Sequence, residues 1–210
     1  MTNIPTERQN QDPSIRALRL DDLDSCLALS TEAGWNQNKN DWRLLLQVCS
    51  GYGIDVPGYV LAGTTMAWEL GERNAWINMV LVAKAYRGRG FARELMAACL
   101  GDLASAQRLA MLDATDLGFN VYSKFGFSGK NRIARLYRES ETESSAPISS
   151  SADGLLLKAM RAEDIDQVAN LDLRVIGIDR ENVLADFYRR ESEAAWVARD
   201  VSGSLRGFVL

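Results

Sequence analysis

At 210 residues, with 47% hydrophobic and 25% charged residues, the chain has an ordinary globular composition and room for one large domain or one and a half small ones. Its net charge of −4 gives no general attraction to nucleic acid or acidic membranes, and no apolar run reaches the length of a membrane span. We therefore predict a cytoplasmic protein that binds neither nucleic acid nor membrane.

The absence of histidine restricts the chemistry further. Without histidine, Ser-His and Cys-His catalysis are excluded and a catalytic zinc site is disfavoured. The three cysteines, Cys26, Cys49 and Cys99, fall in helix-like stretches without close pairing, so we expect reduced, buried thiols and no metal. Any catalysis must then use Tyr, Asp, Glu, Lys, backbone groups or water.

Hydrophobic periodicity predicts a mixed α/β fold over residues 14–138, after a polar tail at 1–13 that has no signal-peptide pattern. In chain order the predicted elements are a strand at 15–18, a helix opened by Asp21 and Asp22, a helix capped by Asn40 or Asp41, strands at 52–56, 59–69 and 75–82, a helix at 92–103, a strand at 108–112, a helix at 117–125 and a strand at 127–137.

A glycine-rich loop, Arg87-Gly88-Arg89-Gly90-Phe91-Ala92, joins the apolar strand at 75–82 to the following amphipathic helix. Glycine lets the backbone turn sharply and approach a ligand, while the first free N–H groups of the helix favour negative charge. Arg87 and Arg89 can add charge-assisted hydrogen bonds. The loop therefore predicts a phosphate or pyrophosphate site. It lacks the Gly-Lys-Ser/Thr of a Walker loop and the third glycine of a dinucleotide fingerprint.

A second motif, Tyr122-Ser123-Lys124-Phe125-Gly126-Phe127, lies after the next predicted strand. It is similar to the Tyr-x-x-x-Gly-Phe ending of the GNAT family of N-acetyltransferases. Arg87, Gly90 and Ala92 likewise fill that family's Arg/Gln-x-x-Gly-x-Gly/Ala pattern. Because two motifs occur in the expected order among the expected elements, residues 14–138 resemble a complete domain of this family.

The resemblance implies that the chain binds acetyl-CoA (coenzyme A). The pyrophosphate would lie on the loop from Arg87 to Ala92, including the amides of Gly88 and Phe91. The pantetheine arm would pair with the backbone at Val80, Leu81 and Val82 as an added strand. A backbone N–H near Leu81 or Val82 would meet the developing oxyanion.

The resemblance also assigns the general acid to Tyr122, which would protonate the departing CoA thiolate. Two positions depart from the common pattern of the family. Thr115 replaces an asparagine and Gly118 replaces an alanine. Thr115 and Asn120 are then the candidates for hydrogen bonds to the cofactor.

The general base is not identified by the pattern. Many family members carry a glutamate on the central strand where this chain has Trp76, and no acidic residue lies between 75 and 82. The nearest candidates are Glu69, Asp113 and Asp116, which also suit a strand-end charge, a turn and a helix cap. An ordered water or an already neutral amine would serve as well, since direct attack on the thioester is then sufficient.

The acceptor wall is expected after the first helix, at Trp35 and Asn36, with Glu69 and Trp76 as further candidate contacts. Trp42 suits either this wall or the core. The predicted activity is transfer of an acetyl group from acetyl-CoA to a primary amine of a small molecule or peptide. The alternative is a catalytically weak acyl-CoA-binding or protein-interaction module, and a third hypothesis is another phosphate ligand in the same loop.

After an acidic, serine-rich linker at 139–153, the start of the chain recurs. The segment 158–166 matches 16–24, and later strands resemble the pair at 52–66. Residues 154–210 therefore predict the first half of a second domain of the same kind, without an acyl-CoA site. Because such a half leaves a sheet edge unpaired, we expect it to pack on the first domain or to form a homodimer.

Overall fold

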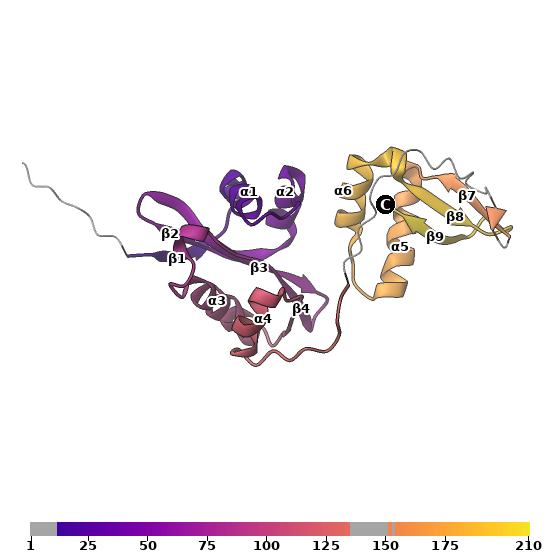
Figure 1. The fold of residues 1–210 in the computed structure, drawn as a ribbon. Coiled ribbons are helices and arrows are strands. Elements are labelled where there is room, and N and C mark those ends of the chain that lie inside the picture. The colour runs from indigo at the N-terminus through magenta and orange to yellow at the C-terminus, as the bar shows by residue number, and fades with distance from the viewer. Residues whose placement is uncertain (1–11, 135–150, 153) are drawn as a thin grey trace, which may run out of the picture. The chain divides into compact units, whose positions relative to one another are not determined.

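The computed structural model describes residues 12–134, 151–152 and 154–210 (Figure 1). These residues form two compact units, one ending at Gly126 and the other beginning at Phe127. Residues 1–11 of the predicted tail, and 139–150 and 153 of the predicted linker, lie outside the described residues.

The first unit is a mixed α/β structure, as predicted. Its sheet has the order β1-β2-β3-β4-β5, with antiparallel pairing except for the parallel pair β4–β5. The elements are β1 (Ser14–Ala17), η1 (Leu20–Asp22), α1 (Leu23–Glu32), α2 (Lys39–Val48), β2 (Ser50–Val56), β3 (Tyr59–Leu70), β4 (Asn74–Val82), η2 (Lys84–Tyr86), α3 (Phe91–Ser105), β5 (Leu109–Leu112) and α4 (Asp116–Ser123).

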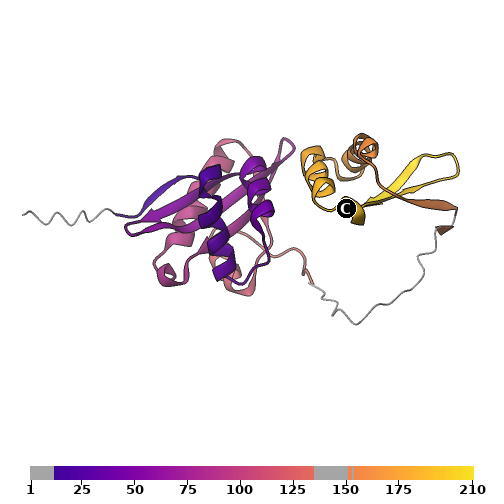
Figure 2. The ribbon, with the colours of Figure 1, turned by 90° about the horizontal axis from the view of Figure 1, so that it is seen from above.

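Helices cover both faces of this sheet (Figures 1 and 2). On one face, α1 and α2 bury Leu29 and Trp42 against Met66 of β3 and Leu81 of β4. On the other, α3 packs across β2, β3 and β4, with Leu95 in the core. Trp42 is fully buried, and its indole Nε1 donates to Ser30 Oγ over 2.8 Å. The indole of Trp42 therefore belongs to the core.

The second helix begins earlier than predicted. Its N-cap is Asn38, whose side chain accepts from the N–H groups of Asn40 and Asp41, while Asp41 accepts from the N–H of Asn38. This reciprocal arrangement satisfies donors that a helix otherwise leaves unpaired. The prediction of a cap at Asn40 or Asp41 was wrong because all three residue types favour the position and Asn38 comes first.

The strand predicted at 127–137 is wrong for residues 127–134, which have no regular secondary structure. Gly126 adopts a φ of 88°, which ends α4 in the left-handed region. The stretch from Ser128 to Arg132 is polar and lacks the apolar alternation of a half-buried strand. Residues 135–137 lie outside the described residues.

β4 separates from its neighbour β5 part-way along its length. The parallel pairs run from Asn74 with Leu109 to Ile77 with Leu112 and include no later residue of β4. Beyond Ile77, β4 has a β-bulge, because Met79 and Val80 together lie opposite one residue of β3. The last residues of β4 therefore have an edge that β5 does not cover, directly before the glycine loop.

The second unit contains β6 (Ser151–Ala152), β7 (Leu155–Ala159), η3 (Ala162–Asp164), α5 (Ile165–Ile176), α6 (Glu181–Arg190), η4 (Ser192–Ala194), β8 (Trp196–Arg199) and β9 (Leu205–Val209). Its antiparallel sheet has the order β6-β7-β8-β9, and Val168, Leu184 and Val197 form its core. β6 lies within the stretch predicted as linker and pairs with β7. From β7 to β9 the order of strands and long helices repeats that of β1 to β3.

Candidate functional site

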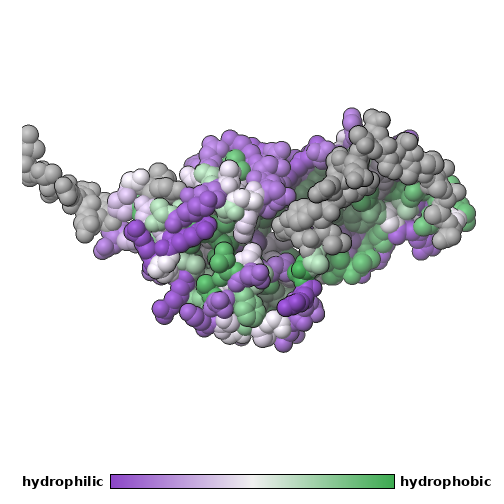
Figure 3. Space-filling view, viewed as in Figure 1, coloured by the Kyte–Doolittle hydropathy of each residue, from purple (hydrophilic) through white to green (hydrophobic). Residues whose placement is uncertain are grey.

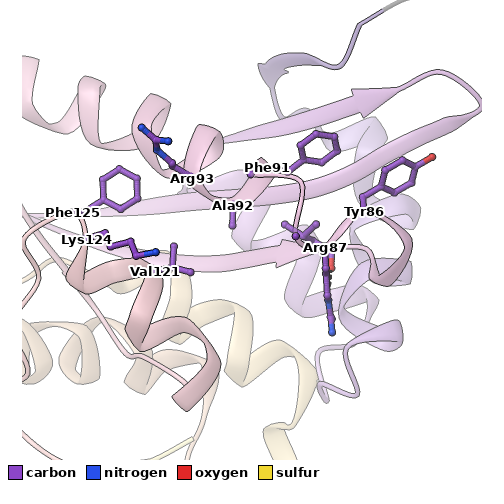
Figure 4. A pocket seen from close by; sticks show the side chains of 11 residues that line it. Tyr86, Arg87, Phe91, Ala92, Arg93, Val121, Lys124 and Phe125 are labelled. Carbon is purple, nitrogen blue, oxygen red and sulfur yellow. Dashed lines mark hydrogen bonds between the residues drawn. The ribbon is translucent and has the colours of Figure 1, made fainter.

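A cavity of about 710 Å³ lies in the first unit, where β4, the glycine loop, α3 and α4 meet (Figure 4). Figure 4 shows Val121 and Lys124 of α4 on one side of this cavity and Ala92 at the start of α3 on the other. The lining residues are Val82, Tyr86, Arg87, Gly88, Gly90, Phe91, Ala92, Arg93, Val121, Lys124 and Phe125.

The loop turns at two glycines with left-handed backbone, Gly88 with a φ of 76° and Gly90 with a φ of 90°. No atom lies within 4 Å of a Cβ built on either glycine, so the requirement for glycine comes from the backbone conformation and not from crowding. Gly90 is the N-cap of α3, and its carbonyl accepts from the N–H groups of Arg93 and Glu94. The amides before Arg93 therefore precede the helical ladder and suit an anion.

The cavity is positively charged. Arg87, Arg93 and Lys124 line it, and its described lining contains no acidic residue. Arg87 also ties the loop to β4, because its Nε donates to the Val82 carbonyl over 3.1 Å. An anionic group bound here would meet three cations together with the helix N-terminus.

Arg89 does not line the cavity. Its guanidinium lies over the Tyr86 ring at 5.0 Å, and that ring stacks on Phe91 with centroids 5.9 Å apart. The cation–π contact and the stacked pair hold the outer side of the loop. The two loop arginines, which look equivalent in sequence, thus have different surroundings.

The predicted cofactor strand is divided between the cavity and the core. Val82 lines the cavity, whereas the side chain of Leu81 is buried under α1 and α2. The side chain of Val80 is half-buried at the bulge and is not among the lining residues. A ligand contact of Val80 or Leu81 would therefore involve backbone groups.

Tyr122 lies on α4 between residues that line the cavity, but it does not line the cavity itself. It is 9% exposed, and burial raises the pKa of its phenol. The ring packs back over its own helix, since a Cβ at Gly118 would come within 2.6 Å of Tyr122 Cε2. The glycine that replaces the family's alanine therefore makes room for this tyrosine.

The two candidate polar contacts near Tyr122 are exposed and do not line the cavity. Thr115 is the N-cap of α4, and its Oγ1 accepts from the Gly118 N–H over 3.2 Å. It, and not Asp116, caps the helix. The carbonyl of Asn120 accepts from the Ser123 hydroxyl over 3.3 Å.

The candidate acceptor contacts and bases also lie outside the cavity lining. Trp35 and Asn36 are exposed after α1, whereas Trp76 is half-buried on β4 opposite Trp68. Glu69 forms an ion pair with Arg108, with Oε2 and Nη2 2.6 Å apart. Asp113 and Asp116 are exposed.

The sequence prediction missed part of the lining, namely Tyr86, Arg93, Val121, Lys124 and Phe125. Two of these carried a usable signal. Arg93 lies three residues after Gly90, in the first turn of α3, and Lys124 lies inside the tyrosine motif. A basic residue close to a predicted anion site deserved inclusion on charge alone.

The cysteines have the surroundings of inert thiols. Burial raises the pKa of Cys26 to about 12, of Cys49 to about 12 and of Cys99 to about 11. These thiols therefore stay protonated near neutral pH. In the part of the chain that the structure describes, no cluster of three or more Cys, His, Asp or Glu residues could hold a metal, and no helix is long and apolar enough to span a membrane.

Solved structures share this fold at low sequence identity. Glucosamine-6-phosphate N-acetyltransferase from Arabidopsis thaliana matches with 15% identity and a TM-score of 0.52, covering 61% of this chain and 100% of that one. A predicted acetyltransferase with acetyl-CoA, from Clostridium acetobutylicum, matches with 14% identity and a TM-score of 0.50, covering 60% and 96%.

A longer match extends into the second unit. A protein of unknown function from Enterococcus faecalis V583 matches with 15% identity and a TM-score of 0.67, covering 95% of this chain and 54% of that one. No curated protein matches the chain. The model of the acetyltransferase (GNAT) family matches residues 19–127, which include β2 to β5, the glycine loop and α4. Because this match spans more than half of the chain, the protein belongs to the acetyltransferase (GNAT) family.

Proposed function

We propose that the first unit transfers an acetyl group from acetyl-CoA to a primary amine of a small molecule or peptide. The observation that carries this proposal is the basic cavity at the N-terminus of α3. It offers free helix amides and three cationic side chains, as a pyrophosphate requires. Family membership and the neighbour with acetyl-CoA support the same ligand.

The chain offers a place for each part of acetyl-CoA. The loop from Arg87 to Ala92 would bind the pyrophosphate, with Arg93 and Lys124 close enough to neutralise further phosphate charge. The uncovered edge of β4 would bind the pantetheine arm through backbone groups of Val80 and Val82. Figure 3 shows hydrophobic surface over the side of the first unit that carries α3 and α4, which suits the apolar parts of such a ligand.

When bound, acetyl-CoA supplies a thioester that an amine can attack. The backbone N–H of Leu81 or Val82 would donate to the thioester oxygen as negative charge develops there. Tyr122 would give its phenolic proton to the departing thiolate, and its raised pKa keeps that proton in place near neutral pH. Neighbouring Val121 and Lys124 already line the cavity, so the tyrosine is on the correct helix.

One observation favours a second candidate function. Tyr122 and the acidic candidates Glu69, Asp113 and Asp116 all lie outside the cavity lining, so an acyl-CoA-binding or protein-interaction module would need only the groups that do line it. In either case we assign ligand binding to the first unit alone. We interpret the second unit as the first half of a related domain without an acyl-CoA site, and as the candidate surface for a homodimer.

The first test is the melting temperature with and without excess acetyl-CoA. A ligand that binds only the folded state at about 100 times its Kd stabilises that state by roughly 2.7 kcal/mol. A clear rise supports the cofactor assignment, and no rise contradicts it. An acetylation assay with a panel of primary amines then separates an enzyme from a binding module.

Replacing the tyrosine tests the catalytic role. Tyr122→Phe should lower kcat roughly a hundredfold, because a general acid contributes at least that factor, while acetyl-CoA affinity stays unchanged. Tyr188→Phe in the second unit is the matched control and should leave both constants unchanged. Equal losses of kcat and affinity in Tyr122→Phe would show that the tyrosine serves packing instead.

A further inference from the structure

The bulge in β4 is the feature that turns the strand edge toward the cavity. Between the pairs Thr64–Leu81 and Met66–Asn78, β3 contributes one residue and β4 contributes two. Met79, one of those two, has a φ of 49°, which is strained for a residue with a side chain. Such a conformation persists only where surrounding contacts hold it.

Thr64 provides such a contact. Its Oγ1 donates to the Met79 carbonyl over 2.7 Å, and the threonine is fully buried. A bulge interrupts the ladder of backbone hydrogen bonds, so its carbonyl needs another donor when water is excluded. The Thr64 hydroxyl fills that role from the side chain, while its own backbone pairs with Leu81.

We propose that Thr64 is a positioning residue for acetyl-CoA, which holds the Met79 bulge so that the edge of β4 from Val80 to Val82 can pair with the pantetheine arm. This inference rests on the proposed function of the first unit. It assigns the pantetheine contact to a buried hydroxyl that does not touch the ligand.

The position of Thr64 explains why the effect should reach this part of the site. Val82 lines the cavity and pairs with Gly63, the residue beside Thr64. If the bulge relaxed, the backbone from Val80 to Val82 would shift in register or direction, because that segment is fixed only on its β3 side. The glycine loop has its own anchors, including the Arg87 contact to the Val82 carbonyl and the N-cap at Gly90.

The chain offers an adjacent control. Thr65 is also fully buried, but its Oγ1 contacts only the Met96 sulfur at 3.9 Å, which is a weak interaction. Thr64→Val and Thr65→Val remove the same atoms from neighbouring positions of one strand. Thr64→Ser keeps the hydroxyl that holds Met79.

The experiment measures the Kd of two probes by calorimetry for the wild type and the three variants. Acetyl-CoA requires both the loop and the edge of β4, whereas adenosine 3′,5′-bisphosphate lacks the pantetheine arm. Thr64→Val should weaken acetyl-CoA binding roughly tenfold, as expected when a buried carbonyl loses its donor, and leave bisphosphate binding within about twofold. Thr64→Ser and Thr65→Val should bind both probes like the wild type.

The outcomes separate this inference from the proposed function. If wild-type protein binds neither probe, the proposed function is overturned and this inference with it. If wild type binds both, and Thr64→Val loses neither or loses both equally, the positioning role of Thr64 is overturned while the proposed function stands. If Thr64→Val does not fold, Thr64→Ala against Thr64→Ser isolates the hydroxyl, and equal acetyl-CoA affinity in those two variants overturns the inference.

Discussion

The two units use one framework for different ends. Each has a strand, a 3-10 turn, two helices and an antiparallel strand pair in the same order. In each, an aspartate at the end of the 3-10 turn accepts a backbone N–H from three residues earlier, Asp22 from Arg19 and Asp164 from Arg161, both over 2.8 Å. The first unit then adds β4, the glycine loop and α3, for which the described residues of the second unit have no counterpart.

The arginine that pairs with this aspartate comes from different strands. In the first unit Arg16 of β1 bridges Asp22 and Asp55, with its Nη2 2.7 Å from Asp22 Oδ1. In the second unit Arg199 of β8 contacts Asp164 Oδ1 over 2.6 Å. The carboxylate position is therefore the constant part of the framework, and its cation can be supplied from either neighbouring strand.

The largest effect we predict breaks this shared feature. Asp22→Asn and Asp164→Asn should each lower the free energy of unfolding of their own unit by about 1.5 to 3 kcal/mol, because a buried hydrogen bond to a charged partner is lost. Urea unfolding followed by hydrogen exchange in α1 and α5 measures the two units separately. Asp21→Asn, on the exposed neighbour of Asp22, is the control and should change nothing. An unchanged midpoint in either buried variant would show that the carboxylate does not hold the turn.

A smaller effect separates the units by their glycines. Gly90 in the loop and Gly203 in the β8–β9 turn have φ values of 90° and 84°, with no atom within 4 Å of a built Cβ. Alanine at either position should cost about 1 kcal/mol of backbone strain. Only Gly90→Ala should also weaken acetyl-CoA binding, by roughly tenfold, as measured by calorimetry. Weaker binding in Gly203→Ala would mean that the second unit contributes to the site.

The smallest effect is a pH dependence confined to the first unit, which contains all three cysteines. Burial raises the folded-state pKa of Cys26, Cys49 and Cys99 to about 11 or 12. Between roughly pH 9 and 11 the unfolded chain therefore binds fewer protons than the folded one, so stability falls as pH rises. Exchange in α1 and α3 should accelerate over this window beyond the intrinsic rate, while α5 follows the intrinsic rate. The same excess acceleration in α5 would contradict the assignment to buried thiols.

Much of the fold was predictable because its signals are local. The apolar run into Arg87 to Ala92 and the amphipathic helix that follows defined β4, the loop and α3 within a few residues. The repeat of 16–24 at 158–166 predicted the shared start of the two units, where η1 and η3 each end in the buried aspartate. The predicted strand at 127–137 was wrong for its described residues because one motif was extended past Gly126 into a polar stretch.

By itself, the sequence determined the identity of the loop, because glycine at Gly88 and Gly90 is required by backbone conformation, a property of single residues. Only the tertiary structure decided which side chains share the cavity. Lys124 reaches it from α4 and Arg93 from α3, whereas Arg89 turns to Tyr86 and Tyr122 folds over Gly118. The physical reason is that side-chain direction depends on packing between elements distant in sequence, which also placed the Thr64 hydroxyl on the Met79 carbonyl.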